Sequence, residues 1–146
     1  MRIIKICGDS MYPTLIDGEQ YMASSFNSLN AKRDQIVAVQ NRDKLLIKRI
    51  IGLPNENIKL TVDANELRIN DVRFILPTTS VEYGVLDYQW ETGENEFVLL
   101  GDNPHHSLDS RKLGVFSGDQ IRYRLRWGLK PLKLRLGKLL LLNKHR

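Results

Sequence analysis

A serine near the start of the chain stands in a setting that would present its hydroxyl group to a partner. An apolar run over residues 3–7 predicts a strand, and Gly8, Ser10 and Pro13 follow it. The proline ring fixes its own φ and keeps the preceding residue out of the helical region, so we expect Ser10 in an extended, rigid segment. Gly8 would let another chain approach the backbone just before the serine. The plain alternative is a strand and a proline-containing turn that happens to hold a serine.

A serine is a weak nucleophile until a base takes its proton, and the base that this sequence offers is Lys48. The lysine lies in the apolar segment 44–51, where strand alternation places it on one face with Leu46 and Ile50. Aliphatic neighbours desolvate the amine and lower its pKa; a largely neutral amine near pH 8 requires a fall of about 2 units from about 10.4. Serine–lysine pairs of this kind carry out acyl transfer. A lysine on a half-exposed strand is the alternative.

A third segment, residues 101–111, is dense in short polar side chains and follows an apolar, strand-like run at 97–100. Such side chains form local hydrogen bonds and fix the conformation of a loop. Asp109 and Arg111 could pair with each other or orient their neighbours, and Ser107 could hold a lysine amine by a hydrogen bond. Taken alone, the segment would pass for an ordinary surface loop.

The three segments, in this order, resemble the type I signal peptidase family, and the resemblance extends over about residues 3–125. It implies that Ser10 is the nucleophile, that the Ser10 backbone N–H is the main oxyanion donor, and that Lys48 is the general base. It also implies that Ser107 hydrogen-bonds the lysine. Ion pairs and hydrogen bonds that support the site are implied for Arg49, Asp102, Asp109 and Arg111. We expect substrate contacts next to the serine, at Met11 and Pro13.

The chain departs from the family pattern at a few positions, none of which removes a catalytic group. Pro104 follows Gly-Asp-Asn, where the family often has arginine, and Asn55 follows Gly-Leu-Pro, where the family usually has glycine. Gly8 stands where some members carry a further serine hydroxyl. The family normally has one or two membrane helices before the serine motif, whereas this chain starts at the expected catalytic strand.

Length and composition suit one globular domain, with 146 residues of which 42% are apolar and 27% charged. Short apolar runs separated by turn residues predict a mainly β, signal-peptidase-like fold of antiparallel strands, barrel-like or two-sheet, with little helix. Residues 77–95 are expected to be irregular, with Trp90 filling the core. The single cysteine, Cys7, excludes an intramolecular disulfide, and we expect it to be buried. The expected strands are 3–7, 19–24, 35–40, 44–51, 58–62, 66–69, 72–76, 97–100 and 114–127.

Charge is distributed unevenly, which suggests a catalytic domain at 1–128 and a basic, leucine-rich tail at 129–146. Residues 121–146 hold nine Lys/Arg and no Asp/Glu. This segment is too charged to span a bilayer, but each Lys or Arg near an anionic leaflet contributes about 1 kcal/mol. We therefore expect peripheral membrane contact, with a solvated basic edge as the alternative. We do not expect a nucleic-acid partner, because few aromatic residues interrupt the charges.

The sequence thus predicts a serine endopeptidase of the signal peptidase I type that cleaves signal peptides from exported preproteins. No metal or organic cofactor is expected, because the sequence has no cysteine cluster and no glycine-rich phosphate loop. We expect a membrane-associated protein without a transmembrane segment in this chain and with an extracytoplasmic active site; a cytoplasmic location stays open. One alternative is the self-cleaving module of SOS-response and phage repressors, which shares Gly-x-Ser-Met and a downstream lysine. The other is a catalytically inactive family member that binds a membrane or a partner.

Overall fold

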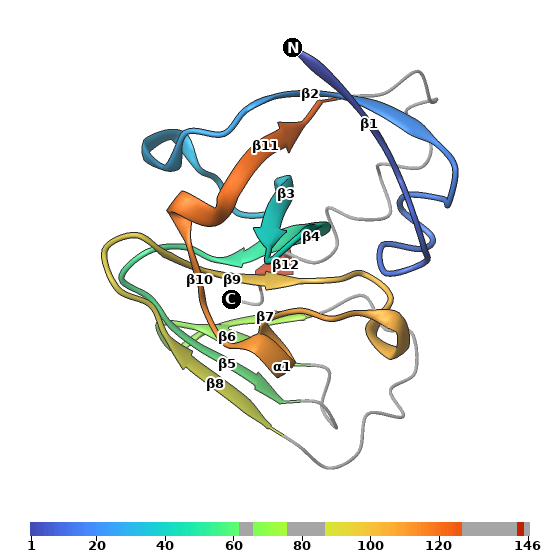
Figure 1. Cartoon of the computed structure of the whole chain (residues 1–146). Coiled ribbons are helices and arrows are strands. Elements are labelled where there is room, and N and C mark those ends of the chain that lie inside the picture. Colours follow the sequence, from blue (N-terminus) through green and yellow to red (C-terminus); the bar gives the residue numbers. More distant parts are fainter. Residues whose placement is uncertain (62–65, 76–86, 127–142, 145–146) are drawn as a thin grey trace.

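Two antiparallel sheets make up the computed structural model, which describes residues 1–61, 66–75, 87–126 and 143–144 (Figure 1). The larger sheet has the strand order β1-β2-β11-β3-β4-β9-β10, and the smaller has the order β12-β7-β6-β5-β8. The larger sheet comprises β1 (Arg2–Lys5), β2 (Gln20–Ser25), β3 (Ile36–Asn41), β4 (Lys44–Gly52), β9 (Glu96–Leu100), β10 (Phe116–Ser117) and β11 (Ile121–Leu125). The smaller comprises β5 (Asn57–Thr61), β6 (Glu66–Ile69), β7 (Val72–Ile75), β8 (Tyr88–Glu91) and β12 (Asn143–Lys144).

Helical structure among the described residues is short. The single α-helix, α1, spans Ser110–Leu113 and directly follows the polar loop that begins after β9. Three 3-10 turns accompany it, at Ser28–Asn30, Pro104–His106 and Gly118–Gln120. The expectation of a mainly β fold with little helix is confirmed, and of the two expected arrangements the two-sheet form is the observed one.

Tight turns set the register of neighbouring strands. Residues 70–71 join β6 to β7 with φ values of 48° and 65°, the two left-handed positions that a type I′ hairpin turn requires. Arg42, with a φ of 56°, lies in the turn between β3 and β4. The register of this second hairpin places Lys48 of β4 opposite Val37 of β3. The lysine is therefore fixed in the middle of the larger sheet.

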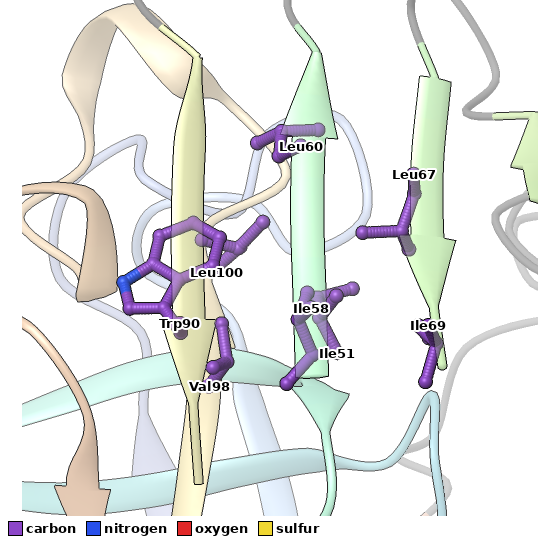
Figure 2. Packing of buried hydrophobic residues seen from close by; sticks show 8 residues of the cluster. All are labelled: Ile51, Ile58, Leu60, Leu67, Ile69, Trp90, Val98 and Leu100. Atoms are coloured by element: carbon purple, nitrogen blue, oxygen red, sulfur yellow. The ribbon is translucent and has the colours of Figure 1, made fainter. Parts of the chain in front are cut away.

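The smaller sheet packs against the end of β4 and against β9 through an apolar cluster (Figure 2). β4 ends at Gly52, where a Cβ atom would lie 2.6 Å from Ile58 and 2.9 Å from Val98, so only glycine allows this approach. Trp90 of β8 is buried in the cluster, and its Nε1 donates to the Ser110 carbonyl at 3.1 Å. The expectation that Trp90 fills the core is confirmed. The cluster comprises Ile51, Ile58, Leu60, Leu67, Ile69, Trp90, Val98 and Leu100.

Two further apolar clusters involve the larger sheet. β3 contributes Ala38 to one cluster and Val37 and Val39 to the other, so this central strand is buried on both faces. The cluster with Ala38 also holds Met11, which comes from the segment after β1. The strand beside β3, β4, thus runs through the interior, and a polar side chain on it is removed from water.

The structure contradicts three details of the fold that the sequence suggested. The segment 114–127, expected as one strand, is divided by the 3-10 turn Gly118–Gln120 into β10 and β11. The segment expected to be irregular contains β8, in which Tyr88 and Trp90 pack in the core cluster; four alternating residues were too short a pattern to separate from the flanking irregular sequence. Cys7 is exposed rather than buried. Ile4 and Ile6 are the buried residues of this segment, and Cys7 lies beyond the end of β1 at Lys5, where the chain leaves the sheet.

Most of the expected basic tail lies outside the described residues, as do residues 62–65 and 76–86. Of the tail, β12 pairs antiparallel with β7 at one edge of the smaller sheet. The division into a domain at 1–128 and a tail at 129–146 stays a prediction. Within the described ranges, no helix is long and apolar enough to cross a bilayer.

Candidate active site

Ser10 lies in a compact turn that follows β1, rather than in the extended segment that the proline suggested. The Tyr12 N–H donates to the Asp9 carbonyl at 3.0 Å, and the Leu15 N–H donates to the Met11 carbonyl at 3.0 Å. Met11 is 1% exposed and anchors the turn in the core, whereas Ser10 is half-buried. The turn therefore holds the serine firmly at the rim of the core.

The backbone just before the serine is open to a partner. Gly8 has a φ of 87°, a left-handed value that favours glycine, and its N–H donates to the Asp17 carboxylate at 2.7 Å. A Cβ atom at this position would meet nothing within 4 Å. Pro13 is exposed, whereas the Met11 side chain is buried, so a substrate could reach Met11 only through its backbone. Substrate contacts at these two residues stay a prediction.

The amine of Lys48 donates a hydrogen bond to the Ser10 hydroxyl, with 2.9 Å between Nζ and Oγ. Lys48 is 2% exposed. Burial lowers the pKa of the amine to about 8; the charge of Asp109 opposes this fall, that of Arg111 adds to it and that of Asp102 opposes it. At a pKa of about 8, about half of the amine is neutral at pH 8 and about a tenth at pH 7. A neutral amine in contact with a hydroxyl is able to accept its proton.

Asp109 is fully buried and accepts five hydrogen bonds, one of them from the Arg111 backbone N–H to Oδ1 at 3.1 Å. Arg111 donates from Nε to Oδ1 at 2.9 Å and from an Nη to Oδ2, while the Gly101 N–H and the Ser107 hydroxyl reach Oδ2 at 2.8 and 2.6 Å. Burial raises the pKa of the carboxyl, but these donors outweigh it and hold the pKa below its usual value. Asp109 is therefore a carboxylate, and Ser107 has its only proton committed to it.

Arg49, which follows Lys48 on β4, is 3% exposed and contacts two carboxylates. Its guanidinium donates to both oxygens of Asp102, at 2.9 and 2.8 Å, and to the Asp34 carboxylate at 2.6 Å. Burial lowers the pKa of Arg49, but Asp102 and Asp34 outweigh this effect and leave the pKa above its usual value. Thr14 donates from its hydroxyl to Asp102. Through its contacts with Arg49 and Thr14, Asp102 thus joins the loop after β9 to β4 and to the serine turn.

Gly101 allows the loop after β9 to touch the serine turn. A Cβ atom at Gly101 would overlap the Ser107 hydroxyl and lie 2.7 Å from the Ser10 carbonyl oxygen. The next contact along the loop is a hydrogen bond from the Asn103 N–H to the same carbonyl, at 2.9 Å. Residues that are about ninety positions apart in the sequence therefore form one compact site.

The two histidines of the loop, His105 and His106, are exposed. Across the described part of the chain, His, Cys, Asp and Glu side chains form no group of three that could hold a metal ion.

Known proteins share this sequence pattern. A sequence model described as "Signal peptidase, peptidase S26" matches residues 1–127. A Bacillus amyloliquefaciens protein named signal peptidase I is 31% identical over 132 residues, covering 78% of this chain and 68% of that protein. Signal peptidase I U of Bacillus subtilis is 32% identical over 128 residues, with 78% and 67% covered. The chain belongs to the signal peptidase (peptidase S26) family. Its family is therefore one of serine-type peptidases.

The fold agrees with that membership. The crystal structure of a signal peptidase I from Enterococcus faecalis superposes with a TM-score of 0.54 at 23% identity, covering 63% of this chain and 93% of that one. At this identity the likeness concerns the fold alone.

Most of the residues that the family pattern indicates lie together in the structure. Lys48 contacts Ser10, Arg49 pairs with Asp102, and Arg111 pairs with Asp109. Ser107 hydrogen-bonds Asp109, and its expected bond with Lys48 is not among those seen between described residues. The roles of these residues in a reaction stay predictions.

Three residues of the site were not singled out from the sequence. Thr14 lies within the serine motif, Asp34 precedes β3, and Asn103 belongs to the polar loop. Each reaches the site through a contact between distant segments, which no local pattern reveals. Asp34 has a φ of 74° in the structure, and both its carbonyl and its carboxylate accept hydrogen bonds from Arg49.

Proposed function

We propose that this chain is a serine endopeptidase of the signal peptidase I type, which removes signal peptides from exported preproteins. Ser10 is the nucleophile and Lys48 the general base. The observation that carries the proposal is the 2.9 Å contact between the Ser10 hydroxyl and a buried lysine whose pKa is lowered to about 8, in a chain of the S26 family. A surface lysine, with a pKa of about 10.4, would remain charged at pH 8 and would be unable to accept a proton.

The first half of the reaction forms an acyl-enzyme. Neutral Lys48 takes the hydroxyl proton of Ser10 while the oxygen attacks the scissile carbonyl carbon. The carbonyl oxygen becomes an oxyanion, to which the Ser10 N–H donates; losing one such donor typically costs about 3 kcal/mol of barrier. The carbon–nitrogen bond then breaks, and protonated Lys48 gives its proton to the leaving amine. The carbonyl carbon remains esterified to Ser10.

The second half of the reaction repeats these steps with water. Neutral Lys48 takes a proton from the water, whose oxygen attacks the ester carbonyl. Collapse of the second oxyanion returns the proton to Ser10 and releases the new carboxyl end. Lys48 is then neutral again, so the cycle consumes one water and needs no cofactor.

The surrounding polar residues orient the base. Ser107 donates its proton to Asp109, so toward Lys48 it is able only to accept. A neutral amine has two N–H donors and one lone pair; an N–H given to Ser107 would direct the lone pair at Ser10. Arg111 and Arg49 each neutralise a carboxylate near the amine, at Asp109 and Asp102. The carboxylates therefore do not hold Lys48 in its charged form.

A membrane surface is the proposed site of action, with the active site on the extracytoplasmic side. Arg122 and Arg124 lie in β11 and Arg126 directly follows it; of the three, Arg122 and Arg126 are exposed. Replacing all three by serine should weaken binding to vesicles with anionic lipids at low salt, and added salt should weaken the wild type in the same way. Equal vesicle binding by the two proteins would contradict this location.

The test of the activity is incubation with a panel of peptides that span signal-peptide junctions, followed by mass-spectrometric mapping of any cut. The wild type should cut at one bond per peptide. Ser10→Ala and Lys48→Ala should each remove nearly all cleavage, and the double variant should be no worse than either, because the two residues act as one unit. Cleavage of the chain itself in place of the peptides would favour the repressor-type alternative, and an inert wild type would favour the inactive one.

A further inference from the structure

Asn103 makes a contact with the serine turn that the proposed mechanism does not use. Its backbone N–H donates to the Ser10 carbonyl at 2.9 Å, and its side-chain Nδ2 donates to the Asp9 carbonyl at 3.0 Å. We propose that Asn103 is a positioning residue for the oxyanion site, because it fixes the peptide plane that carries the Ser10 N–H. The inference rests on the proposed function and adds a residue to it.

The peptide bond between Asp9 and Ser10 connects the asparagine to the oxyanion donor. In a trans peptide the C=O and the N–H lie in one plane and point in opposite directions. The bond from Asn103 to the Asp9 carbonyl therefore sets the direction of the Ser10 N–H. The Tyr12 N–H donates to the same carbonyl at 3.0 Å, so the carbonyl has one partner within the turn and one outside it. Among the bonds between described residues, the one from the Asn103 side chain ties this plane to the loop after β9.

The Ser10 N–H is available for a substrate. Among the described residues, no oxygen accepts a hydrogen bond from it. With two consecutive carbonyls, those of Asp9 and Ser10, directed at Asn103, the N–H between them points away from the loop. A donor that is already aimed at the position of the oxyanion does not have to reorganise during the reaction, which is what makes such donors effective.

The side chain of Asn103 makes this contact in place of the capping hydrogen bond that is usual for asparagine at its position. Asn103 directly precedes the 3-10 turn Pro104–His106, a position where asparagine commonly caps a free N–H. Here the side chain makes no capping hydrogen bond and reaches instead to the serine turn. Its amide nitrogen must face Asp9, because a carbonyl oxygen only accepts. An aspartate would keep the shape but would place a carboxylate oxygen against the carbonyl.

The experiment compares the wild type with Asn103→Ala, Asn103→Asp and a matched control, Asn95→Ala. Asn95 also donates from its amide, at 3.3 Å to Asp119, but on an exposed surface away from the serine turn. One readout is the second-order rate at which a small fluorophosphonate labels Ser10, which needs the oxyanion donor but no peptide subsites. The other is kcat and KM, across pH, on a junction peptide that the wild type cuts. A thermal unfolding curve of each variant gives its transition temperature, and all assays are run below the lowest of these temperatures.

We expect both Asn103 variants to lose about ten- to a hundredfold in labelling rate and in kcat, since a small misplacement of a reacting group can cost a hundredfold. KM should stay within about twofold, and in Asn103→Ala the pH midpoint set by Lys48 should not move. Asn95→Ala should match the wild type. Asn103→Asp keeps the shape of the side chain but replaces the N–H donor by a carboxylate oxygen and adds a charge, so the pH midpoint is compared in Asn103→Ala.

Three results would overturn the inference while leaving the proposed function intact: wild-type labelling of Ser10 in both Asn103 variants, a loss confined to KM, or a shifted pH midpoint in Asn103→Ala. The last would mean that Asn103 acts through Lys48. A wild type that neither reacts with the label at Ser10 nor cuts any junction peptide would instead overturn the proposed function, and this inference with it.

Discussion

At the scale of single residues, the proposed mechanism depends on lowering the pKa of one buried amine. Lys48 has two carboxylates nearby, Asp109 and Asp102, which on their own would hold it protonated. Each carboxylate is paired with a guanidinium, that of Arg111 or Arg49, and the charge of Arg111 acts together with burial to lower the pKa of Lys48. Burial then decides the outcome and lowers the pKa of Lys48 to about 8.

Replacing Ser107 tests how the base is oriented. Ser107→Ala removes the acceptor proposed for the Lys48 amine and one donor to Asp109. Positioning of the base matters mainly in the transition state, so kcat should fall about ten- to a hundredfold while KM changes little. Ser107→Thr keeps the hydroxyl and should recover part of the rate. The measurement is steady-state kinetics on a soluble peptide; an alanine variant with wild-type kcat would show that the loop does not orient Lys48.

At the scale of elements, the site forms where three segments meet: the serine turn after β1, the middle of β4 and the loop after β9. Backbone and side-chain hydrogen bonds from Asn103 and Thr14 connect the turn to the loop. The approach of loop and turn is close enough that Gly101 cannot carry a side chain. The geometry of the Ser10–Lys48 pair therefore depends on a glycine that takes no part in the chemistry.

Gly101→Ala should damage both stability and activity. The added methyl group would overlap the Ser107 hydroxyl and crowd the Ser10 carbonyl, so loop and turn must separate. We expect a loss of about 1 to 3 kcal/mol in the free energy of unfolding, typical of overpacking, and at least a tenfold fall in kcat. Chemical denaturation and kinetics measure the two effects. Gly93→Ala is the control, because its Cβ would meet only the flexible Glu96 side chain, at 3.3 Å; equal effects at both glycines would count against this account.

The sequence allowed the strands to be predicted where alternation was long or turns were clear, as in β3, β4 and β6. It also allowed the family's residues to be named, because they fall in three short segments. It did not show β8, which has four residues, or the exposure of Cys7. Contacts such as those of Thr14 and Asp34 join segments that are distant in the chain, so they depend on sheet order and not on any local pattern.

At the scale of the whole molecule, burial of Lys48 lowers the stability of the fold. The folded-state pKa of Lys48 is about 8, below its ordinary value of 10.5. Between these two pH values the unfolded chain binds more protons than the folded one, so stability rises with pH across this window. Below pH 8 the full cost of burying the amine is present, at most about 3 kcal/mol.

Lys48→Met should therefore stabilise the protein at the expense of activity. Methionine fills a similar volume without a charge, and we expect a gain of about 1 to 3 kcal/mol in the free energy of unfolding at pH 6 to 7, after the loss of the bond to Ser10. The gain should shrink as the pH rises from 8 toward 10.5. Urea denaturation of both proteins at pH 6, 8 and 10 measures the difference. A variant that is less stable than the wild type at pH 6 would refute the claim that burial of Lys48 lowers the stability of the fold.

The most direct measurement is the rate at which a fluorophosphonate labels Ser10 between pH 6 and 10, in the wild type and in Lys48→Ala, with the modified residue mapped by mass spectrometry. If neutral Lys48 activates Ser10, labelling of the wild type occurs at Ser10, rises with pH as the amine loses its proton, and is half-maximal at about pH 8. Lys48→Ala then labels at least a hundredfold more slowly. Labelling of Ser10 at the same rate in both proteins would contradict the account.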